Sequence, residues 1–83
     1  MNDMIILNAI LGTLDKYIGT LKSAEARGWN FSKDINFLEK ESNDLWHLVV
    51  AGVRTPERVE GRAARLAMIG RDLVGLVELF PEK

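Results

Sequence analysis

The segment from Ile10 to Ser23 consists of two copies of one seven-residue pattern, I-L-G-T-L-D-K followed by Y-I-G-T-L-K-S. Leucines recur every seven residues, and a second set of side chains falls between them, which places both sets on one side of an α-helix. Leu11 and Ile18 widen this apolar stripe. A stripe this wide must be buried against other helices. Its members are Leu7, Ile10, Leu14, Tyr17, Leu21 and Ala24.

A line of small residues runs along the same helix, about 100° or more away from the apolar stripe. It consists of Gly12, Gly19 and Ala26. A glycine inside a helix costs roughly 1 kcal/mol relative to alanine. Two glycines at one heptad position therefore indicate a close approach by the backbone of another helix, and we expect Gly12 and Gly19 at an interface between copies. The alternative is that both glycines are merely tolerated on an exposed surface.

Length and composition are those of a small folded domain. The chain has 83 residues, of which 47% are hydrophobic and 28% charged, and we expect one domain, residues 1–83. It contains no cysteine, which excludes a disulfide framework and a thiolate metal site. No apolar run is long enough to span a bilayer. Met1-Asn2-Asp3 lacks the basic start and apolar run of a secretory signal, so we expect a cytoplasmic protein without a membrane partner.

The sequence predicts three helices, at about residues 3–27, 33–51 and 56–80. Gly28 follows the first and can adopt the left-handed conformation that ends a helix. Thr55-Pro56 is a typical helix start, an N-cap followed by a proline at the first position, and Pro81 stops the third helix. Because the links are short, we expect an all-α, up-down-up three-helix bundle, completed by oligomerisation.

Each of the last two helices carries one inner stripe at three- and four-residue spacing. Ser42 is the one hydroxyl in the second stripe and needs a hydrogen-bond partner. In the third stripe large residues alternate with small ones, so a neighbouring helix can pack closely at Ala63 and Gly70. The predicted inner residues are Ile35, Leu38, Ser42, Leu45, Val49 and Gly52, then Val59, Ala63, Leu66, Gly70, Leu73, Val77 and Phe80.

The helices carry more apolar surface than a three-helix monomer buries. Phe37 and Leu48 lie almost opposite Ile35 on the second helix, among acidic residues. Ile69 and Leu76 extend the apolar part of the third helix beyond one stripe. We therefore expect Ile69 and Leu76, with the two glycines, at an interface between copies, and Phe37 and Leu48 in contact with a partner protein.

Three arginines, Arg58, Arg62 and Arg65, line one side of the third helix. One interpretation is a stripe that contacts phosphate or an acidic partner. The other is ion pairing within an antiparallel hairpin, because Arg62 comes level with the second helix near Glu41 and Asp44. A formal net charge of −1 and the absence of a reading motif make nucleic acid an unexpected partner.

Two acidic pairs, Glu41-x-x-Asp44 and Glu57-x-x-Glu60, lie on adjacent predicted helices, and each pair can share a divalent cation. Over Phe37–Val74 this arrangement is similar to the all-α nucleoside triphosphate pyrophosphohydrolases of the MazG type. The resemblance implies magnesium held by these four carboxylates. Capping of the third helix by its first-turn acids is the alternative explanation of the second pair.

Two function classes follow from these residues. The first is a small non-enzymatic helical interaction module, a homodimer that also binds another protein through Phe37, Leu48 and the arginines and needs no cofactor or metal. An adaptor, a regulator or a phage-type inhibitor of a host protein would fit. The second is a minimal magnesium-dependent pyrophosphohydrolase, and a regulator that binds nucleic acid through the arginines is a further alternative.

Overall fold

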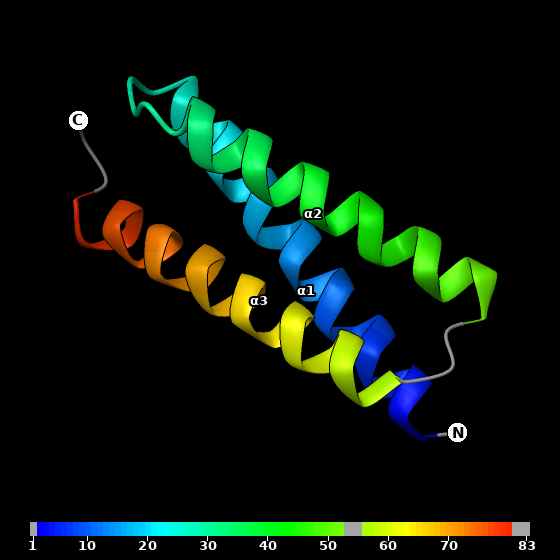
Figure 1. Ribbon diagram of the computed structural model, residues 1–83. Helices are drawn as coiled ribbons and strands as arrows, with labels where there is room; N and C mark the ends of the chain where they lie inside the picture. The colour runs from blue at the N-terminus through cyan, green and yellow to red at the C-terminus, as the bar shows by residue number, and fades with distance from the viewer. Residues whose placement is uncertain (1, 53–55, 81–83) are drawn as a thin grey trace.

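The computed structural model describes residues 2–52 and 56–80, where it contains three α-helices and no strand (Figure 1). They are α1 (Asn2–Glu25), α2 (Ser32–Ala51) and α3 (Pro56–Leu79). Successive helices run antiparallel, so the predicted all-α, up-down-up arrangement is confirmed, with every boundary within two residues of the prediction. The expected cap at Thr55 and stop at Pro81 lie outside the described residues.

Helix α1 lies between the other two. It contacts both α2 and α3 along its length, whereas α2 and α3 contact each other much less (Figure 1). The Cα atoms span 43 × 19 × 14 Å, so the cross-section is oblong rather than equilateral. Helices α2 and α3 therefore flank α1, and the Arg62–Glu41 ion pair joins the sides on which they meet.

The core is built on the heptad stripe of α1. Leu7, Leu11, Leu14 and Leu21 are completely buried, and Ile18 is nearly so. Burying one such side chain contributes roughly 1.5–3 kcal/mol, so α1 supplies the largest share of the apolar stabilisation. Further buried residues are Phe31 in the link before α2, Ile35, Leu38 and Leu45 on α2, and Val59, Ala63, Leu66, Val74 and Val77 on α3.

The two inner stripes hold except at their ends. Gly52 is exposed and adopts φ 79° because it ends α2 as a left-handed cap, with its N–H donating to the carbonyl of Val49. Phe80 lies one residue beyond the end of α3 and is 60% exposed. Both residues were predicted to be buried, and both predictions are wrong. The three- and four-residue spacing continues past the last helical residue and therefore does not indicate where the helix ends.

Helix α1 ends as the glycine signal predicts. Gly28 has φ 104°, its N–H donates to the carbonyl of Glu25, and the N–H of Trp29 donates to the carbonyl of Ala24. These two bonds form a Schellman motif, which satisfies carbonyls that the helix itself leaves free. The chain then turns so that Trp29 stacks on Phe31 with ring centroids 5.4 Å apart.

The first turn of α2 is held from the end of α1. The carboxylate of Glu25 accepts a hydrogen bond from the hydroxyl of Ser32 at 3.0 Å and another from the N–H of Phe31 at 3.4 Å. An acid beside a helix N-terminus also complements the helix dipole. One side chain therefore links the end of α1 to the start of α2.

No helix in the described part of the chain is both long and apolar enough to cross a membrane.

Helix α3 approaches α1 closely at Gly70, as its place in the inner stripe predicts. A Cβ at this position would lie 3.1 Å from Cβ of Tyr17 on α1. At Gly75, on the same helix, a Cβ would meet nothing within 4 Å. The two glycines are therefore a matched pair, one with space for a side chain and one without.

We expect Gly70→Leu to lower the free energy of unfolding by about 1–3 kcal/mol, because the added side chain overpacks the contact with Tyr17. Gly75→Ala should raise it by about 0.5–1 kcal/mol, because alanine favours the helix. Urea unfolding followed by circular dichroism measures both. Equal effects of the two substitutions would contradict a close approach at Gly70.

Candidate functional site

The predicted contact residues come together on one side of the bundle. Residues on each helix recur at four- and three-residue spacing, so each set shares one side of its helix. The ion pair between Arg62 of α3 and Glu41 of α2 shows that these two sides adjoin. We call this surface the α2–α3 face; it consists of Phe37, Glu41, Asp44 and Leu48 on α2 and of Arg58, Arg62, Arg65, Ile69 and Leu76 on α3.

Arg62 makes the ion pair expected within the α2–α3 hairpin. Its guanidinium donates to the carboxylate of Glu41. Both side chains are partly exposed, so the pair contributes only about 0–1 kcal/mol to stability. Among the described side chains, Arg58 and Arg65 make no ion pair, and both are exposed. Two of the three arginines are thus free to contact a partner.

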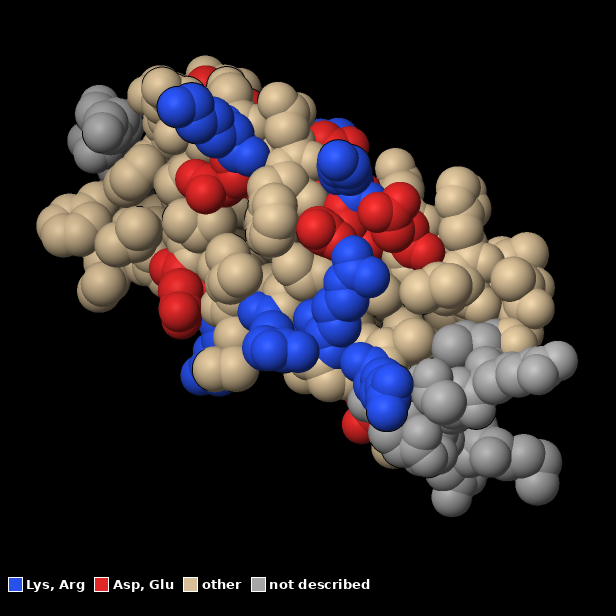
Figure 2. Space-filling view, in the orientation of Figure 1, with Lys and Arg blue, Asp and Glu red and all other residues tan. Residues whose placement is uncertain are grey.

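Apolar side chains continue the same face. Phe37 is 48% exposed, Ile69 42% and Leu76 44%, and Leu48 is also exposed. Figure 2 shows acidic side chains over the middle of α2 with basic side chains beside them on the same helix, basic side chains over the N-terminal half of α3, and mostly uncharged surface at the C-terminal end of α3. The face therefore combines an acidic edge, a basic edge and exposed apolar surface.

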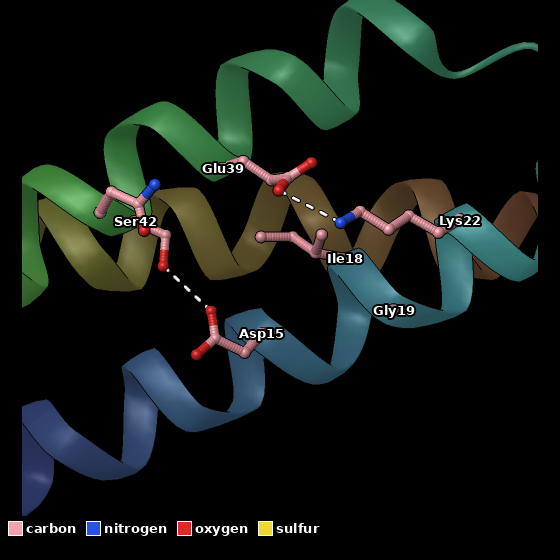
Figure 3. Close-up of a pocket in the computed structure, with 7 residues that line it drawn as sticks. Asp15, Ile18, Gly19, Lys22, Glu39 and Ser42 are labelled. Atoms are coloured by element: carbon pink, nitrogen blue, oxygen red, sulfur yellow. Dashed lines mark hydrogen bonds and ion pairs between the residues drawn. The ribbon is translucent and has the colours of Figure 1, made fainter.

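A polar cleft of about 240 Å³ lies between α1 and α2, on another side of the molecule (Figure 3). Asp15 lies at one end of it (Figure 3): one carboxylate oxygen accepts from the hydroxyl of Ser42 at 3.0 Å and the other from the indole N–H of Trp46 at 3.2 Å. Farther along the cleft, Lys22 pairs with Glu39 at 3.2 Å. These contacts fasten α2 to α1 and give the predicted partner of Ser42.

The role of Asp15 was not predicted, although the repeat contains a signal for it. Asp15 and Lys22 occupy the same position in the two heptads, with opposite charge. Each reaches α2, Asp15 to Ser42 and Lys22 to Glu39. Two residues of opposite charge at one heptad position are consistent with a row of polar contacts to a neighbouring helix. The small residues Gly12 and Gly19 had directed the prediction to a different kind of contact.

A second surface that was not predicted is a shallow apolar trough of about 350 Å³ between α1 and α3, away from α2. The hydroxyl of Thr13 donates to the carbonyl of Ala9, so this threonine is satisfied within its own helix. The sequence feature that could have predicted the trough is the small residues on each helix, Ala9 and Thr13 on α1 and Ala64 and Ala67 on α3. The trough is lined by Ile6, Ala9, Ile10, Thr13, Ala64 and Ala67.

Gly12 and Gly19 lie away from the α2–α3 face. A Cβ at either position would meet nothing within 4 Å, so no helix of the same chain approaches their backbone. The expected close approach would have to come from another molecule. Gly19 borders the polar cleft, which the missing side chain leaves open.

Among the described residues, the acids implied by the pyrophosphohydrolase resemblance do not all come together. Arg62 already pairs with Glu41. Glu60 points about 160° around α3 from Arg62, away from Glu41 and Asp44. The side chain of Glu57 lies outside the described residues, and among those described no three acids or histidines lie close enough together to hold a metal ion.

The chain matches no family model, and the comparisons with curated proteins and with solved structures found no match.

We expect Asp15→Ala to lower the free energy of unfolding by about 1–3 kcal/mol, because Ser42, only 2% exposed, loses its hydrogen-bond acceptor. Ser42→Ala should cost less, because it removes the buried hydroxyl itself. The double variant should cost less than the sum of the two single variants. Additive costs in urea unfolding would show that the hydroxyl does not depend on Asp15.

Gly12→Ala and Gly19→Ala should each raise the free energy of unfolding by about 0.5–1 kcal/mol and leave the mass in solution unchanged, because alanine favours a helix and meets no neighbour. Thermal melts and light scattering measure the two quantities. Loss of an oligomer in either variant would instead establish the predicted interface at these glycines.

Proposed function

We propose that the protein is a small non-enzymatic helical module that binds other proteins by docking of helix faces, as a homodimer. The observation that carries the proposal is the α2–α3 face, where Phe37, Ile69 and Leu76 remain between 42% and 48% exposed. Large apolar side chains rimmed by charge are typical of protein-binding surfaces.

The way the face is built also favours binding over catalysis. Its charged groups lie along its middle, where Glu41 and Arg62 pair across the two helices, and its exposed apolar side chains lie before and after them along the bundle. An amphipathic helix laid along such a surface would bury Phe37 and Leu76 and place its own charges over the charged middle. An adaptor, a regulator or a phage-type inhibitor of a host protein would each act through a surface of this kind.

The mass in solution, measured by light scattering over a hundredfold range of concentration, is the first test. We expect a dimer that dissociates on dilution. Phe37→Asp should abolish the dimer, because a carboxylate would be buried in the interface without a partner. Helix content should stay the same. At dilutions where both proteins are monomers, the variant should have the same melting temperature as the natural chain, because Phe37 lies outside the core.

Val50→Asp is the matched control. Val50 is 84% exposed on the same helix, about 140° around it from Phe37. The same kind of substitution there should leave the dimer intact. A natural chain that stays monomeric at every concentration would contradict the homodimer, and a large loss of helix content in Phe37→Asp would place this residue in the core.

A further inference from the structure

We propose that the occupant of the α2–α3 face is a second copy of this chain, bound so that α2 of each copy covers α3 of the other. The inference rests on the proposed function, because it names the occupant of the same face; another protein then binds there only in competition with the second copy.

The accessible surface supports an occupant of this size. The chain exposes 5669 Å², whereas a folded monomer of 9.3 kDa exposes about 5,000 Å². The excess is roughly 700 Å². A specific interface of standard size buries about 800 Å² on each partner. The excess over a typical monomer is thus close to the area that one copy would lose in such an interface.

The charges on the face identify which occupant fits. Glu41 and Asp44 make the middle of the α2 edge negative, with Lys33 and Lys40 towards its N-terminal end, and Arg58, Arg62 and Arg65 make the α3 edge positive. A partner must present the reverse pattern, a positive edge over α2 and a negative edge over α3. A second copy presents both edges at the required separation, since it carries the same two helices.

Symmetry selects one orientation of that copy. A two-fold axis that lies in the interface along the helices places α2 of one copy on α3 of the other, acid over arginine, twice in each dimer. A two-fold axis across the helices places α2 on α2 and α3 on α3, which offers neither edge its opposite charge. Charge complementarity therefore favours the first orientation.

In this orientation each residue of the second copy lies at the same height along the bundle axis as the same residue of the first copy. Within one chain Glu41 is level with Arg62, so Asp44 is about level with Arg58. In the dimer Asp44 of one copy then lies over Arg58 of the second copy. Phe37 comes within about one helical turn of Ile69 of the second copy, so apolar contact accompanies the charge pairs.

Disulfide trapping tests this register, because the chain contains no cysteine of its own. An Asp44→Cys chain is mixed with an Arg58→Cys chain and oxidised mildly. We expect the mixed disulfide to exceed both disulfides between like chains by about tenfold, a difference of about 1.4 kcal/mol. A Ser23→Cys chain, exposed on α1, is the control and should not be trapped as a dimer.

Charge exchange tests the pairing itself. Glu41→Arg with Asp44→Arg makes both edges positive, and Arg58→Glu with Arg62→Glu makes both negative. The dissociation constant of the dimer should be at least about 100-fold higher for each variant alone than for the natural chain, because like charges meet at both contacts. Mixing the two variants should restore dimerisation, and salt should weaken the natural dimer. Circular dichroism should show both variants folded, since the ion pair they break is partly exposed.

The outcomes separate this inference from the function it rests on. Three results would overturn the arrangement but not the homodimer. They are a dimer whose affinity is unchanged by the charge exchange, a natural dimer that becomes tighter with salt, and a disulfide-linked dimer of the Ser23→Cys chain. A natural chain that is monomeric throughout would overturn both. Mixed-disulfide trapping together with rescue on mixing would establish the arrangement.

Discussion

The width of the apolar stripe on α1 is the constraint on which the rest of the structure depends. Side chains from Leu7 through Leu21 cover too much of the helix circumference for one neighbour to bury. Two neighbours are therefore needed, and the chain supplies them as α2 and α3, one on each flank. Because both pack chiefly on α1, they meet each other only weakly. The α2–α3 face follows directly from this arrangement, since the sides that α2 and α3 turn towards each other have no fourth helix to cover them.

Burial and charge have separate roles in this bundle. Each buried leucine of α1 contributes roughly 1.5–3 kcal/mol, whereas an exposed ion pair such as Lys22–Glu39 contributes about 0–1 kcal/mol. The charges therefore add little to the stability of the fold. Asp15 is the exception, because it satisfies the buried hydroxyl of Ser42 and so fixes how α2 sits on α1. The charges of the α2–α3 face can change with little effect on folding, which leaves them free to determine what binds there.

Local rules account for most of what the sequence predicted. The heptad spacing identified the buried residues of α1, Gly28 identified the end of that helix, and helical angles identified Phe37 and Leu48 as exposed. The Arg62–Glu41 pair followed from counting residues around the hairpin. The features that were not predicted depend on how helices sit side by side. The contacts of Asp15 with Trp46 and the trough beside Ala64 require the lateral placement of α1, which periodicity along one helix does not determine. Phe80 was misplaced because a repeating pattern contains no information about where a helix ends.

The sign pattern of the α2–α3 face narrows the kind of partner further than its apolar content does. A surface of one sign would attract oppositely charged molecules over a distance of about 8–10 Å and would suit nucleic acid. Here acidic and basic edges run side by side, so their fields largely cancel beyond the bundle. The electrostatic potential differs between the edge of Asp44 and the edge of Arg65 only at contact distance, so it acts only on a molecule that already touches the face. Such a pattern provides little long-range attraction and instead selects one orientation at short range. A protein surface with matching stripes meets that requirement, and the two-fold copy of this chain meets it through the same residues that create it.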